Sequence, residues 1–128
     1  MAYIIGCLMA GLSFLVNKLL LRFIGSQSVI TYSPIFEEMA KTLCSYYLNA
    51  DILVTHVVFG SLEAGYDWFT SSSSERGSLA ALLSIVGHTL FGLVTVAVLS
   101  ASNSIIGAIF LGVCLHLIWN VIFIRFFS

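Results

Sequence analysis

The chain has 128 residues, of which 59% are hydrophobic and only 9% are charged, and its mean hydropathy is +1.06. Because soluble domains carry about 25% charged residues, this composition excludes a soluble globular protein and predicts an integral membrane protein in contact with the lipid bilayer. The formal net charge is −1 and the five Lys and Arg residues are scattered, which excludes nucleic acid as a partner.

Apolar stretches separated by short polar turns predict an all-α membrane bundle of about five helices, in a single membrane domain over residues 1–128. The first, fourth and fifth are clear spans. The second, at about 22 Å against a hydrocarbon core of about 30 Å, and the third are short and weak. This pair could stop short of the far side or form a re-entrant hairpin. The expected helices cover residues 2–23, 34–48, 52–69, 78–99 and 104–127.

The start of the second helix is predicted from Ser33 and Pro34. Ser is a good N-cap, and the missing N–H of Pro costs nothing at the first helical position. The acidic pair at residues 37–38 would then lie in the first turn, where the helix dipole favours negative charge. Residues 25–28 and 71–77 have the composition of loops.

The basic residues predict the orientation of the bundle. When five helices alternate in direction, Lys18, Arg22, Arg76 and Arg125 all fall on the same side of the membrane. Segments with more Lys and Arg stay in the cytoplasm, so we expect the N-terminus outside and the C-terminus inside, in the plasma or inner membrane.

Several polar residues are predicted to meet in the cytoplasmic half of the bundle. A charge at the centre of a spanning helix costs about 2.5 to 3.5 kcal/mol, so three charges within residues 37–41 imply partners or a water-filled cavity. His88 and His116 fall roughly 15 Å deep, and Asn120 follows one turn after His116 on the same face. The residues expected to converge are Glu37, Glu38, Glu63, His88, His116 and Asn120.

This set of side chains suits the activation of water. A carboxylate can remove a proton from water while imidazole or amide N–H groups stabilise an oxyanion, which favours hydrolysis. Four of the same side chains could instead bind a divalent metal such as zinc, because carboxylates and imidazoles are ligands that suit this ion. These ligands would be Glu37, Glu63, His88 and His116.

Four motifs stand in order on four successive predicted helices: E-E-x-x-K at residues 37–41, F-x-x-x-E at 59–63, a histidine helix at 88–92 and H-x-x-x-N at 116–120. Together they resemble the PrsW-type intramembrane proteases, relatives of the CAAX prenyl endopeptidase and CPBP family. The motif-bearing core covers residues 34–127, so the first helix lies outside it.

The resemblance implies a membrane-embedded endopeptidase with a cytoplasm-facing site, acting on a membrane-associated peptide or protein. Lys41 and Phe59 are supporting residues of the motifs. The implied catalytic residues are Glu37 as the water-activating base, Glu38 in its support, Glu63 and His88 to complete the site, and His116 and Asn120 as oxyanion donors.

Two other functions stay open: a non-catalytic scaffold or immunity-type membrane protein of the same fold, and a proton- or ion-coupled carrier that uses buried Glu and His residues as a relay. Carriers usually show internal repeats and broken helices, whereas this sequence has no repeat and one proline. A scaffold needs no convergent polar set, so this set favours an enzyme.

Residues 37–41 alone also fit a solvated helix start. His56 matches no motif and is expected to be structural, and a homo-oligomer stays open.

Overall fold

The computed structural model describes the backbone of residues 1–127 and the side chains of residues 1–25 and 30–123. It confirms the all-α fold class, because the described chain forms five helices and no strand. They are α1 (Ala2–Phe23), α2 (Ser26–Tyr47), α3 (Ile52–Thr70), α4 (Ser74–Ser102) and α5 (Ile105–Phe127). Of these, α1, α4 and α5 are long and apolar enough to cross a membrane, which confirms the three clear spans and a membrane protein.

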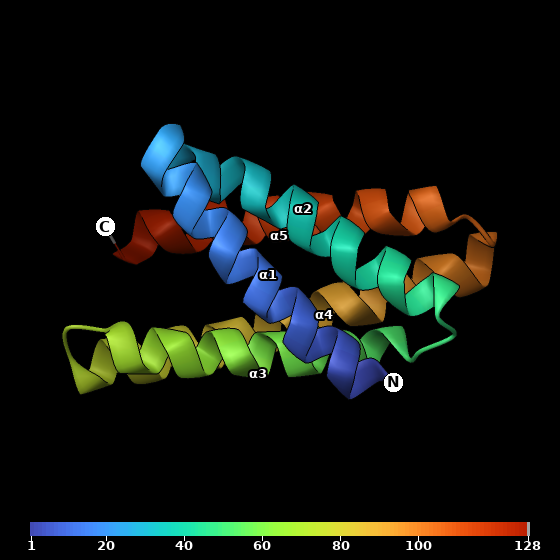
Figure 1. Ribbon diagram of the computed structural model, residues 1–128, viewed down its shortest axis with the longest axis horizontal. Helices are drawn as coiled ribbons and strands as arrows, with labels where there is room; N and C mark the ends of the chain where they lie inside the picture. The colour runs from blue at the N-terminus through green and yellow to red at the C-terminus, as the bar shows by residue number, and fades with distance from the viewer. Residues whose placement is uncertain (128) are drawn as a thin grey trace.

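The five helices close a ring. α1 packs on α2 and α3, α4 packs on α3 and α5, and α5 also packs on α2. In Figure 1 the turn between α1 and α2, the loop between α3 and α4, and the C-terminus all lie at the left end. Consecutive helices therefore run in opposite directions, which places Arg22 and Arg76 at the same end of the bundle. The side chain of Arg125 lies outside the described residues.

The predicted start of α2 is wrong. The helix begins at Ser26, so the loop predicted over residues 25–28 is reduced to the junction at Gly25, whose φ of 100° reverses the chain. Pro34 lies inside the helix. A proline removes one intrahelical hydrogen bond, and membrane bundles tolerate it when neighbouring groups satisfy the freed carbonyl. The acidic pair consequently lies in the middle of α2 and gains nothing from the helix dipole.

The expected shortness of α2 is also wrong. With 22 residues it is about 33 Å long by the rise per residue. Neither α2 nor α3 is among the three apolar spans. Polar content rather than length therefore distinguishes this pair from the other helices.

α4 begins earlier than predicted. The Ser73 hydroxyl accepts a hydrogen bond from the backbone N–H of Arg76, so the helix starts at Ser74, and Glu75 lies in its first turn. An N-cap serine and an early acidic residue both stabilise a helix start. The predicted loop over residues 71–77 is therefore only three residues long.

Candidate functional site

A stripe of polar side chains on α2 faces the interior of the bundle. They form two rows, 33–37–41–45 and 38–42, each with a spacing of four residues, and the two rows lie side by side on one broad face of the helix. Each is at most 3% exposed. α2 is thus polar on its buried face, as expected where membrane helices enclose a polar site. The stripe consists of Ser33, Glu37, Glu38, Lys41, Thr42 and Ser45.

Glu38 is the centre of a buried hydrogen-bond network. Its Oε1 lies 2.7 Å from Nζ of Lys41 and 3.0 Å from Nδ1 of His116. Its Oε2 lies 3.0 Å from Nε2 of His56. Glu38 is completely buried. Because an unpaired carboxylate would be costly here, the three donors account for its burial.

Lys41 connects this centre to α4. Its Nζ lies 3.0 Å from Nδ1 of His88 and 4.2 Å from the ring centroid of Phe59. On the other side of the imidazole, Nε2 of His88 lies 2.6 Å from Oε2 of Glu63. The lysine donates to Nδ1 and the carboxylate accepts from Nε2–H, so both nitrogens of His88 have partners.

Glu37 points away from Glu38 and is held by α1. Its Oε1 accepts from the Ser13 hydroxyl at 2.5 Å and lies 2.6 Å from the Ser33 hydroxyl and 3.5 Å from Nδ2 of Asn17. Among the described side chains no hydrogen bond reaches its Oε2. That oxygen is therefore available to a ligand or a water molecule.

A cavity of about 380 Å³ lies between the helices. It takes residues from α1 to α5, with Phe91 and Trp119 among its apolar walls. Five of the six residues predicted to be catalytic line it, and Glu38 lies behind this lining, in the network described above. The five are Glu37, Glu63, His88, His116 and Asn120.

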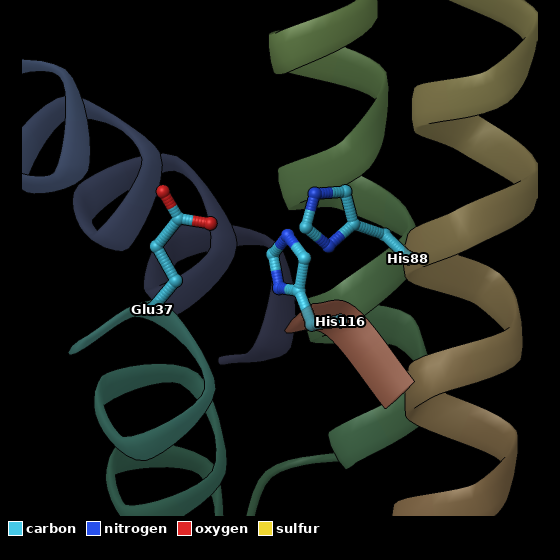
Figure 2. Close-up of side chains that lie close together, drawn as sticks. All are labelled: Glu37, His88 and His116. Carbon is cyan, nitrogen blue, oxygen red and sulfur yellow. The ribbon is translucent and has the colours of Figure 1, made fainter. Parts of the chain in front are cut away.

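Three of these side chains approach one another closely. Glu37, His88 and His116 each offer a ligand atom, and these atoms lie within 4.8 Å of one another. Figure 2 shows the carboxylate from α2 and the imidazoles from α4 and α5 pointing toward one another. The fourth predicted metal ligand, Glu63, is not in this group and instead bonds Nε2 of His88.

Glycines make room for the network. A Cβ atom on Gly60 would lie 2.7 Å from Cβ of His88, and one on Gly92 would lie 2.8 Å from Cβ of His56. Real Cβ atoms essentially never approach so closely. Both helices α3 and α4 therefore need glycine where they face a site histidine.

The sequence prediction missed three contributors. Ser13 and Asn17 on α1, outside the predicted motif-bearing core, contact Glu37. Their spacing of four residues on an apolar helix is a signal that could have indicated them. His56, which was expected to be structural, bonds Glu38 instead of only filling space.

A comparison with known proteins finds no matching family model, curated protein or solved structure. The resemblance to PrsW-type proteases therefore rests on the four motifs and stays a prediction.

Proposed function

We propose that this protein is a membrane-embedded endopeptidase that hydrolyses a membrane-associated peptide or protein. The observation that carries the proposal is the approach of Glu37, His88 and His116 within 4.8 Å on the wall of one cavity. Ionisable groups are expensive inside a membrane protein, and a scaffold gains nothing by directing them into a cavity. A carboxylate, an imidazole and an amide around a cavity are the groups that acyl hydrolysis needs.

The proposed reaction begins at Glu37. Its Oε2 removes a proton from a water molecule, and the resulting hydroxide attacks the carbonyl carbon of the peptide bond. The side-chain amide of Asn120 donates to the oxyanion that forms. The proton then passes to the leaving nitrogen, directly or through Nε2 of His116, as the C–N bond breaks. The products are a carboxylate and a free amine.

The bond between His116 and Glu38 favours a role for His116 as a proton acceptor. Because Nδ1 donates to the carboxylate, the ring can donate from Nε2 to an oxyanion only when it is doubly protonated. A neutral ring instead presents an unprotonated Nε2. We assign the neutral form, because among the described side chains no acceptor bonds Nε2 of His116, so no hydrogen bond calls for a second proton on the ring. The resemblance implies two oxyanion donors, His116 and Asn120, and only Asn120 then keeps that role.

A zinc-dependent form of the same reaction is the second candidate. Nε2 of His116 suits a metal, since a carboxylate on the other nitrogen orients many ligating histidines. Glu37 offers a second ligand. His88 would have to release Lys41 or Glu63, because both of its nitrogens have partners. With the ion bound, it would polarise the carbonyl oxygen or lower the pKa of a water molecule.

The charges support the proposed orientation. Lys18 and Arg22 close α1 and Arg76 opens α4 at the same end of the bundle, so we place that end in the cytoplasm of a plasma or inner membrane. Arg76 and Asn17 also line the cavity. The proposed site therefore opens toward the cytoplasm.

The test is hydrolysis measured in H₂¹⁸O. Purified protein in detergent is incubated with peptides from membrane proteins, and mass spectrometry detects one ¹⁸O atom in each new C-terminal carboxylate. We expect Glu37→Gln to reduce the rate at least ~10²-fold, the scale of general-base catalysis. Glu75→Gln is the matched control, because Glu75 is exposed at the start of α4, and it should leave the rate unchanged.

The outcomes separate the candidates. Activity that disappears with a chelator and returns with zinc would replace the metal-free mechanism by the zinc-dependent one. Activity that survives Glu37→Gln would refute the role of Glu37. If the wild-type protein incorporates no ¹⁸O with any peptide, the non-catalytic scaffold is the better explanation.

A further inference from the structure

His56 has no place in the proposed reaction, yet it is one of the most constrained side chains of the bundle. It is completely buried on α3 and is not among the residues that line the cavity. Gly92 on α4 leaves the space for its ring, since a Cβ atom there would lie 2.8 Å from Cβ of His56. A side chain that only filled this space would be apolar, because a buried ionisable group is costly in a membrane protein.

The hydrogen bonds of His56 fix where its protons are. Nδ1 lies 2.9 Å from the backbone oxygen of Ile52, and Nε2 lies 3.0 Å from Oε2 of Glu38. A backbone carbonyl accepts and never donates, so Nδ1 carries a proton. Nε2 then either donates to an ionised Glu38 or accepts from a protonated one.

Lys41 decides between these two states. Its Nζ lies 2.7 Å from Glu38, 3.0 Å from His88 and 4.2 Å from the ring centroid of Phe59. The approach to the ring face is typical of a charged ammonium group, which is attracted by the ring quadrupole. An ammonium at 2.7 Å favours the ionised carboxylate, which has no proton to donate. Nε2 of His56 is therefore a donor.

We infer that His56 is a positioning residue that, together with Lys41, holds the Glu38 carboxylate so that His116 keeps its proton on Nδ1 and presents Nε2 to the cavity. His56 donates to Oε2 and Lys41 to Oε1, which fixes both oxygens of the carboxylate. His116 bonds the same Oε1 at 3.0 Å through Nδ1. A carboxylate fixed in this way sets the tautomer and the ring orientation of its histidine.

This inference rests on the proposed function only for its consequence in catalysis. Its test measures the protonation of the imidazole nitrogens directly. The protein has three histidines, so ¹⁵N spectra of ring-labelled protein in detergent give few signals. The variants His88→Asn and His116→Asn assign two of the rings, and the remaining signals belong to His56. We expect two protonated nitrogens on His56 and, on His116, a protonated Nδ1 with an unprotonated Nε2.

Two variants separate positioning from simple packing. His56→Gln places an amide N–H where Nε2 stands and can still donate to Glu38. His56→Asn places its amide near Nδ1, so it can bond Ile52 but does not reach Glu38. We expect the Gln variant to keep the His116 signals and the Asn variant to change them to a mixture of both tautomers.

An unprotonated Nε2 on His56, or equal changes of the His116 signals in both variants, would overturn the inference. If the Asn variant fails to fold, the wild-type His56 signals and the Gln variant still decide the question. The ¹⁸O assay is independent of these spectra. If the spectra are as expected but no hydrolysis occurs, the endopeptidase is refuted and the positioning role of His56 stands. If hydrolysis occurs but Nε2 of His56 is unprotonated, the positioning role is refuted and the endopeptidase stands.

Discussion

Lys41→Met should be strongly destabilising although it replaces a charged residue by an apolar one inside a membrane protein. Lys41 is completely buried, and the substitution removes its bond to Glu38 at 2.7 Å and its bond to His88 at 3.0 Å. Removing one partner of a buried ion pair typically costs about 3 to 5 kcal/mol, because the other charge stays buried. Such a loss corresponds to a rise of roughly a hundredfold or more in the unfolding equilibrium constant.

The assay is reversible unfolding in mixtures of a mild detergent and sodium dodecyl sulfate, followed by circular dichroism. Lys18→Met is the matched control, because Lys18 is exposed on α1, and it should change the free energy of unfolding by less than about 0.5 kcal/mol. The double variant Glu38→Gln, Lys41→Met removes both charges. It should cost at least about 1 kcal/mol less than the sum of the single variants, since residues in one network are coupled.

An ordinary hydrogen bond between membrane helices contributes only about 0.6 kcal/mol on average. A cost of Lys41→Met below about 1 kcal/mol would therefore show that Lys41 is an ordinary donor and does not balance a buried charge. Additivity of the two single variants within about 0.5 kcal/mol would lead to the same conclusion. Either result would remove the electrostatic basis of the network around Glu38.

Four further results are expected. Asn120→Ala should reduce the rate of hydrolysis by about 10²- to 10³-fold with the fold unchanged, as the loss of one oxyanion donor does, and an unaffected rate would exclude that role. Gly60→Ala should destabilise the bundle by about 1 to 3 kcal/mol, because its Cβ would meet His88 at 2.7 Å. Gly65→Ala, with nothing within 4 Å of the new methyl group, should instead stabilise it by about 0.4 to 1 kcal/mol. Single cysteines at positions 76 and 125, in a variant without the native cysteines, should react with an impermeant reagent from the same side of the membrane, and labelling from opposite sides would refute the predicted arrangement of five alternating helices.

Composition and hydrophobic runs were sufficient for the fold class. The all-α membrane bundle and the bounds of α1 follow from apolar stretches that are long enough to form spans, and the number of helices follows from these stretches together with the polar turns between the helices. The motifs also indicated that Glu37, His88 and His116 would come together, because ionisable groups in the middle of apolar helices must find a shared interior.

Only the tertiary structure decided what each polar residue contacts. Local signals placed a helix start at Pro34, whereas α2 begins at Ser26. The sequence treated Glu37 and Glu38 as one acidic pair. Adjacent residues on a helix point about 100° apart, so Glu37 faces the cavity while Glu38 faces Lys41 and His56 in the interior. Contacts between side chains distant in sequence, such as Ser13 with Glu37, depend on how helices cross, and no pattern along a single helix contains that information.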